Sequence, residues 1–326
     1  MDLSDSSDEN RAPGGATAAG RAASVKSLKR SLESGARSAA VFRLTRAEER
    51  QLLSAARAGD RKALERLLRL LSGPVYRFGR GFCGDPDDAE DVTQITLAAL
   101  ARSLRDFRGE SSLTTWAYAV ARNACTRHRR RGVHAPARFE SLEPGTSERP
   151  GALQVADPGE DPHRALERAE LRAALERAIA SLPPSQREVL VLRDVEGLPA
   201  KEVGKTLRLT ERAVKSRLHR ARVALRDLLA PHVAVGAAAR PSAPGPRCPD
   251  TARLVSRYLE GELDAGACAK LEAHVRSCAD CGAACETLRA ALSTCRTWRG
   301  ERLPEQIQAS LRQALRQVVT ETRARP

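Results

Sequence analysis

The apolar residues of this chain recur at helical spacing over two long blocks and one short segment. The first block runs from about residue 44 to 131, and the second runs from about residue 164 to 229. After Pro304, the residues Ile307, Leu311, Leu315 and Val318 follow one another at intervals of four, four and three, which is typical of one face of an amphipathic helix. The pattern therefore predicts an all-α protein.

Three stretches without this periodicity divide the chain. Residues 1–43 mix Ser, Ala, Gly and charges, and we expect them to be disordered. Residues 132–163 hold five prolines and six acids against two arginines, and residues 231–247 are rich in Ala, Pro and Gly. The predicted order is a disordered tail (1–43), a helical domain (44–131), an acidic linker (132–163), a second helical domain (164–230), a linker (231–247), a Cys-rich domain (248–298) and a terminal amphipathic helix (299–326).

Composition narrows the class of protein. Aromatic residues make up only 3% of the chain, which argues against a large all-β fold. The net charge of +14 predicts a polyanionic partner, either nucleic acid or an anionic membrane surface. No stretch approaches the roughly 20 apolar residues of a spanning helix, and the N-terminus lacks a signal-peptide pattern. We therefore expect a cytoplasmic protein without a membrane partner, whose cysteines are thiols or metal ligands. Without a Walker loop or nucleophile elbow, we expect no enzymatic activity.

The second block has the spacing of a helix-turn-helix. Residues 182–193 begin a helix with proline in its first turn, and Gly197 is placed to end it. A short helix at 200–207 then leads into a turn, and Thr210 is a good N-cap for a longer helix. Two helices joined by so short a turn form a typical DNA-binding unit.

The longer helix has one buried stripe and one basic face. The stripe consists of Val214, Leu218, Ala221, Leu225 and Leu228. Away from it lie Arg212, Lys215, Ser216, Arg217, His219, Arg220 and Arg222. A solvated basic face is one interpretation of these residues. The preceding helix and turn favour the other, in which the helix enters a major groove and contacts bases and phosphates.

The first block contains an acidic helix start and an arginine-rich helix end. Asp85 is a predicted N-cap, Pro86 follows it, and acids fill the first turns, either to compensate the helix dipole or to dock a basic partner. Further on, a polar loop leads into a helix with Trp116 and Tyr118 that closes in arginines. Charge combined with stacking groups suits single-stranded or melted DNA, although Trp116 as a core residue is an alternative.

Six of the eight cysteines cluster near the C-terminus, whereas Cys83 and Cys125 stand alone in the sequence. Cys248, His274, Cys278 and Cys281 provide three thiolates and one imidazole at spacings that suit tetrahedral Zn²⁺. Simple burial of the cysteines is the alternative. Cys268, Cys285 and Cys295 exceed a four-ligand site, and they are candidate sensing thiols for a soft ion or an oxidant.

Four motifs in order resemble an extracytoplasmic-function (ECF) sigma factor of the sigma-70 family. They are DDAEDVTQIT from Asp87, FRGESSLTTW from Phe107 with the following ARN at 121–123, LPPSQREV from Leu182 and VKSRLHRA from Val214. The resemblance covers about residues 45–230. It implies two helical sigma domains, region 2 and the helix-turn-helix of region 4, joined by an acidic linker that threads the polymerase interior. A helix-turn-helix regulator that acts without core polymerase is the alternative.

The resemblance also implies site residues. Asp88, Asp91 and Gln94 would dock on core RNA polymerase. Promoter DNA at the −10 element would contact Ser111, Ser112, Thr114, Thr115, Trp116, Arg122, Asn123, Arg127 and Arg130. The −35 element would contact Arg212, Lys215, Ser216, Arg217, His219 and Arg220. The chain departs from the family pattern at Arg208, where the turn usually has glycine, and at Gly204, where the helix usually has alanine. Each departure would cost on the order of 1 kcal/mol.

The Cys-rich block resembles a zinc-binding anti-sigma domain. The resemblance rests on Cys248, on YLEGEL from Tyr258, on LEAH from Leu271 and on CADC from Cys278. It implies that the four residues named above bind zinc, and that the domain contacts the sigma domains of its own chain. The arrangement also resembles a subgroup with a C-terminal cysteine-rich domain that responds to copper, cadmium or zinc. Whether the domain inhibits or activates stays open.

Overall fold

The computed structural model describes residues 46–83, 85–134, 162–233, 248–300 and 303–321, and these ranges contain helices and no strand. The predicted tail and most of the acidic linker lie outside the described residues. No described helix is long and apolar enough to cross a bilayer. The all-α class predicted from the sequence is confirmed.

The first block folds as an N-terminal bundle of α2 (Arg46–Arg57), α3 (Arg61–Cys83), α4 (Pro86–Ser103) and α5 (Leu113–His134). Helices α3, α4 and α5 pack against one another, and Phe78 stacks on Phe82 and lies against the tilted ring of Tyr118. The predicted cap is present, since the Asp85 carboxylate accepts hydrogen bonds from the backbone N–H groups of Asp87 and Asp88. Helix α4 therefore starts where its capping chemistry predicts.

The second block folds as a middle bundle of α6 (Pro162–Ser181), α7 (Pro184–Leu190), α8 (Ala200–Leu207) and α9 (Glu211–Leu229). A π-helical turn (Val191–Val195) follows α7, and Gly197 then takes a φ of 68°. Arg208 occupies the turn between α8 and α9 with a φ of 56°, and Thr210 caps α9 through Ala213. The helix-turn-helix is therefore present at the predicted residues.

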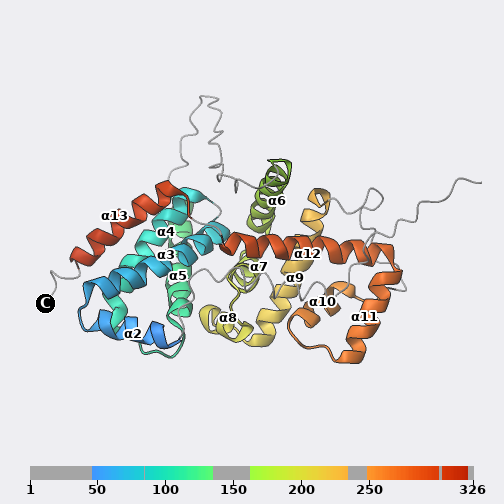
Figure 1. Cartoon of the computed structure of the whole chain (residues 1–326), viewed down its shortest axis with the longest axis horizontal. Helices are drawn as coiled ribbons and strands as arrows, with labels where there is room; N and C mark the ends of the chain where they lie inside the picture. The colour runs from blue at the N-terminus through green and yellow to red at the C-terminus, as the bar shows by residue number, and fades with distance from the viewer. Residues whose placement is uncertain (1–45, 84, 135–161, 234–247, 301–302, 322–326) are drawn as a thin grey trace, which may run out of the picture.

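The Cys-rich module consists of α10 (Thr251–Leu259), α11 (Ala265–Ser277) and α12 (Ala279–Gly300). Helix α12 extends from this module along the middle bundle, where it packs against α6 and α9 (Figure 1). Trp298 near its end is buried in the large core shared by both bundles, and its ring stacks under the guanidinium of Arg172. The module is thus not separate from the two bundles.

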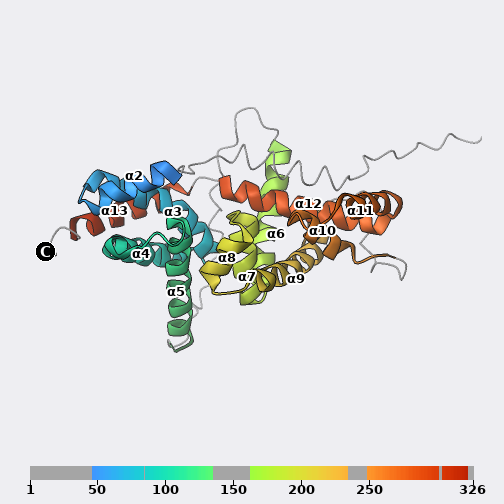
Figure 2. The ribbon, with the colours of Figure 1, turned by 90° about the horizontal axis from the view of Figure 1, so that it is seen from below.

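The terminal helix α13 (Glu305–Glu321) packs on α3 and α4 of the N-terminal bundle. Figures 1 and 2 both place it beside α3. Leu311, Leu315 and Val319 are buried there, while Ile307 and Val318 are half-buried. The amphipathic stripe seen in the sequence therefore covers a face of the N-terminal bundle.

Candidate metal centre and nucleic-acid interface

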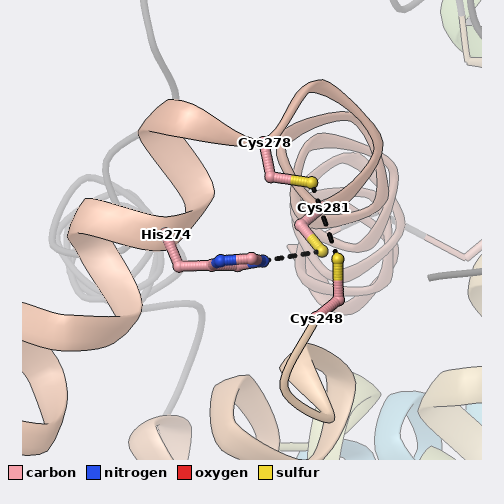
Figure 3. A group of neighbouring side chains, drawn as sticks. All are labelled: Cys248, His274, Cys278 and Cys281. Atoms are coloured by element: carbon pink, nitrogen blue, oxygen red, sulfur yellow. Dashed lines mark hydrogen bonds between the residues drawn. The ribbon is translucent and has the colours of Figure 1, made fainter. Parts of the chain in front are cut away.

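Four side chains from three segments converge at one point of the Cys-rich module (Figure 3). They are Cys248 before α10, His274 in the last turn of α11, Cys278 before α12 and Cys281 in its first turn. Their potential ligand atoms all lie within 4.8 Å of one another. The set matches the four residues that the sequence predicted.

The distances suit a tetrahedral ion. The Sγ atoms of Cys248 and Cys278 are 3.8 Å apart, and His274 Nε2 lies 3.2 Å from Cys281 Sγ. Metal–sulfur bonds of zinc length give a tetrahedral edge of about 3.8 Å. Three sulfurs and one imidazole nitrogen also form the donor set that zinc favours. The residues present therefore fit a zinc ion.

A backbone hydrogen bond and burial shift the pKa values of Cys278 and Cys281 in opposite directions. The backbone N–H of Cys281 donates to the thiol of Cys278 and lowers its pKa, which favours a thiolate at the start of the helix. Burial raises the pKa of Cys281 to about 11, although Thr251 Oγ1 donates to its sulfur. A cation bound between the four side chains would stabilise the Cys281 thiolate, because it would place a positive charge beside it.

The three remaining thiols of the module lie in different surroundings. Cys268 is half-buried and faces the carbonyl of Leu263. Burial raises the pKa of Cys285 to about 12, and it also raises the pKa of Cys295, which is fully buried beside the middle bundle. Their role as sensing thiols stays a prediction. A reagent would reach Cys285 and Cys295 only after the module opens.

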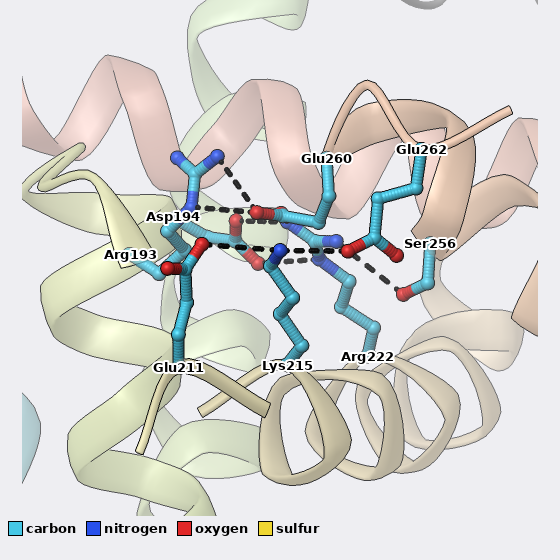
Figure 4. A network of polar contacts seen from close by, with 8 residues as sticks. All are labelled: Arg193, Asp194, Glu211, Lys215, Arg222, Ser256, Glu260 and Glu262. Carbon is cyan, nitrogen blue, oxygen red and sulfur yellow. Dashed lines mark hydrogen bonds and ion pairs between the residues drawn. The ribbon is translucent and has the colours of Figure 1, made fainter. Parts of the chain in front are cut away.

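The residues of the predicted −35 surface on α9 differ in exposure, and one of them forms ion pairs with carboxylates. Arg212, Ser216 and Arg220 are exposed, and Arg217 and His219 are half-buried. Lys215 forms ion pairs of 3.1 Å with Glu211 and 2.6 Å with Glu262 of the Cys-rich module. Figure 4 shows these carboxylates on either side of the Lys215 ammonium.

The prediction that Arg222 lies on the basic face of α9 is wrong. Its side chain is buried and pairs with Asp194 at 2.6 Å and with Glu260 at 3.2 Å. Glu260 also pairs with Arg193, so the two arginines of the middle bundle share one carboxylate of the module (Figure 4). Arg222 is therefore a structural residue. The sequence placed it off the apolar stripe but contained no local sign of its partners.

Some of the predicted −10 residues are exposed, and others contact the middle bundle. Asn123 and Arg127 are exposed on α5, and Ser111, Ser112, Thr114 and Trp116 are exposed or half-buried at its start. Thr115 is buried and donates to Glu202 of α8, while Arg122 pairs with Glu188 of α7 at 2.7 Å. The side chain of Arg130 lies outside the described residues. The structure therefore brings most of these residues to one helix, with two of them against the middle bundle.

The predicted docking residues lie along α4. His128 of α5 lies within 4 Å of both Asp88 and Asp91. Gln94 donates to Ser310 of α13 at 3.2 Å, and Ser310 in turn donates to Glu90. Gln94, in the middle of α4, is thus in contact with the terminal helix, while Asp91 is exposed.

A buried carboxylate that the sequence analysis missed joins the two bundles. Glu196 accepts hydrogen bonds from Arg77 at 2.9 Å and from the Tyr118 hydroxyl at 2.7 Å. Burial raises the pKa of Tyr118, so its hydroxyl stays a donor. No local pattern marks Glu196, because its two partners lie far away in the sequence.

The matches to protein-family models follow the same three parts of the molecule. Residues 65–134 match the model described as Sigma-70 region 2, and residues 172–225 match Sigma-70, region 4. Residues 248–282 match a model described as a putative zinc-finger.

Individual proteins match part of the chain. The RNA polymerase sigma-H factor of Pseudomonas aeruginosa is 31% identical over 190 residues, which cover 58% of this chain and 97% of that protein. The ECF RNA polymerase sigma factor SigM of Mycobacterium tuberculosis is 31% identical, over 55% of this chain and 83% of that protein. A chain in the structure of CnrH in complex with the cytosolic domain of CnrY aligns with a TM-score of 0.40 and 24% identity, over 56% of this chain and 96% of that one.

Proposed function

Since this chain belongs to the ECF RNA polymerase sigma factors of the sigma-70 family, we propose that its C-terminal part holds it inactive until a signal opens it. Sigma factors are transcription initiation factors and not enzymes. In the proposed closed form, the Cys-rich module and α13 contact the surfaces that serve polymerase and promoter. The helix-turn-helix regulator without polymerase is not favoured, because region 2 is matched as well.

The contact between α13 and α4 carries this proposal. Gln94 and its neighbour Glu90 hydrogen-bond Ser310, and the apolar side of α13 is buried against the same bundle. We assign core-polymerase docking to Asp88, Asp91 and Gln94. A polymerase helix cannot contact Gln94 on this face while α13 lies there, so docking requires α13 to leave.

The promoter surfaces support the same interpretation. We assign −35 recognition to Arg212, Lys215, Ser216, Arg217, His219 and Arg220, and the Lys215 ammonium is neutralised by Glu262. We assign −10 contacts to the residues of α5 and its preceding loop. Because Thr115 and Arg122 bind acids of the middle bundle, their access to DNA requires the bundles to separate.

Transcription by the full-length protein tests the closed form. We expect Leu311→Asp/Leu315→Asp to raise core binding and run-off transcription, because a buried carboxylate at either position destabilises the α13 contact. Ala309→Asp introduces the same residue on the exposed side of α13 and is the matched control. A double variant that keeps its helicity and gains no transcription would remove α13 as an inhibitor. Binding to −35 DNA without any binding to core would favour the regulator alternative.

The metal cluster is the proposed sensory part. We expect about one Zn²⁺ per chain in the purified protein, held by Cys248, His274, Cys278 and Cys281. The proposed signal is copper or cadmium that binds first to Cys268, which is half-buried, and then to Cys285 or Cys295 as the module opens. We also propose a cytoplasmic location for the protein. Elemental analysis should show loss of zinc in Cys278→Ser/Cys281→Ser but full zinc content in Cys268→Ser. Retained zinc in the double variant would place the ion elsewhere.

A further inference from the structure

Two cysteines that stand 42 residues apart in the sequence meet in the N-terminal bundle. Cys83 is the last residue of α3, and Cys125 lies in the middle of α5. Their sulfurs are 3.1 Å apart, with the Cys83 thiol donating to Cys125. Both are thiols, and neither belongs to the Cys-rich module.

The separation distinguishes this pair from the metal cluster. In the cluster, Cys248 and Cys278 stand 3.8 Å apart, which is about the edge of a tetrahedral zinc site. The Cys83–Cys125 separation is shorter. Among the described residues, this pair is not part of a group of three or more His, Cys, Asp or Glu side chains that could hold a metal ion. A disulfide needs an approach of only about 1 Å more, since its S–S bond is about 2.05 Å. The geometry favours oxidation over metal binding.

The two thiols also differ in exposure. Cys83 is half-buried at the end of its helix, whereas Cys125 is fully buried. A small oxidant therefore reaches Cys83 first, and Cys125 lies beside it as the thiol that completes the reaction. We propose that Cys83 and Cys125 form a reversible, peroxide-sensitive dithiol in region 2, distinct from the Cys-rich module.

The reaction balances with one peroxide. The Cys83 thiol loses its proton, the thiolate attacks one peroxide oxygen and the O–O bond breaks. Cys83 becomes a sulfenic acid, and the leaving hydroxide takes up the thiol proton and is released as water. The Cys125 sulfur then attacks the Cys83 sulfur, the S–O bond breaks, and a second water leaves with the Cys125 proton. Two thiols lose two electrons and the peroxide gains them.

The bond would join the end of α3 to the middle of α5. Asn123 and Arg127, which are exposed on α5, flank Cys125 in the sequence. The disulfide would therefore fix the helix that carries the proposed −10 contacts to its neighbour. This places a redox-active site in the sigma domain itself.

Peptide mapping of the full-length protein tests the proposal. The reduced protein is treated with one equivalent of hydrogen peroxide, alkylated with iodoacetamide and digested without reductant. We expect the Cys83 and Cys125 peptides to appear linked, two hydrogen atoms lighter than their sum, and to separate on addition of dithiothreitol. Cys268 is the reference for linkage, because it is also half-buried but faces a carbonyl and not a second thiol, so its peptide should not appear linked to another.

Variants complete the test. In Cys125→Ala we expect Cys83 to stop at the sulfenic acid and to be captured by dimedone, whereas in Cys83→Ser we expect Cys125 to stay reduced. The proposal is overturned if wild-type Cys83 is oxidised to sulfinic acid without a linked peptide. It is also overturned if Cys83 is still fully alkylated after the peroxide treatment.

Discussion

Two cations of α9 meet carboxylates of the Cys-rich module in different ways. Arg222 is almost fully buried, and Asp194, Glu260 and Ser256 surround its guanidinium. Removing one member of such a buried group leaves an uncompensated charge, so this contact is structural. Lys215 is about one-third exposed, and its hydrogen bonds with Glu262 and Glu211 raise its pKa. DNA phosphates can therefore replace Glu262 at Lys215 but not the acids at Arg222.

Glu262→Gln should strengthen binding to −35 DNA. The substitution removes the carboxylate that neutralises Lys215, and an exposed ion pair of about 0.2–1 kcal/mol corresponds to a gain of roughly 1.4- to 5-fold. Fluorescence anisotropy with labelled −35 duplex would measure it. Glu286→Gln removes the same charge from the module, where Glu286 forms an ion pair with Arg289 of the same helix, and it should change nothing beyond the net-charge effect. Equal affinities in both variants would mean that Glu262 does not compete with DNA.

At the scale of elements, the helix-turn-helix shows how two departures from the family pattern act together. Arg208 adopts the left-handed conformation, which favours glycine. Gly204 lies one turn earlier, its carbonyl accepts from Leu209, and a Cβ there would meet the Leu209 carbonyl oxygen at 2.7 Å. The glycine therefore makes room for this turn, so its presence is more than a loss of helix propensity.

Substitutions in this turn should have opposite signs. Arg208→Gly should stabilise the fold by about 1 kcal/mol, because glycine adopts positive φ without strain. Gly204→Ala should destabilise it by roughly 1–3 kcal/mol, since the added methyl group meets backbone and not a flexible side chain. Urea denaturation followed by circular dichroism gives both values. A stabilising Gly204→Ala would show that the turn relaxes away from the added methyl.

Helix starts and long-range contacts differ in how far the sequence predicts them. The caps at Asp85 and Thr210 were predictable because a capping side chain acts on its own neighbours in the chain. The convergence of Cys248, His274, Cys278 and Cys281 was predictable because zinc limits residue type and spacing. Burial of Thr115 and the Glu196 contacts depend on how bundles pack, and no local pattern encodes that. The contact between Cys83 and Cys125 could not be predicted for the same reason.

At the scale of the whole molecule, α12 connects the metal cluster to the sigma core. Cys281 in its first turn belongs to the cluster, while Cys295 and Trp298 near its other end are buried in the core of the bundles. Because the metal cluster and the buried Trp298 belong to one continuous helix, we expect disorder at the cluster to weaken the packing of α12 on the middle bundle. The small second core of the module, which includes Val255 and Leu271, would be weakened by the same change.

Removal of the metal should therefore expose Cys295. A structural metal contributes much of the folding energy of a small module, so chelation should loosen α10 and α11 and release α12. Burial raises the pKa of Cys295 and slows its alkylation in the closed form. We expect iodoacetamide to modify Cys295 much faster after EDTA treatment, as measured by mass spectrometry of its peptide. Cys125, equally buried in the N-terminal bundle, is the control and should stay protected under reducing conditions. If Cys295 stays protected in metal-free protein, the contact between α12 and the sigma core does not depend on the ion.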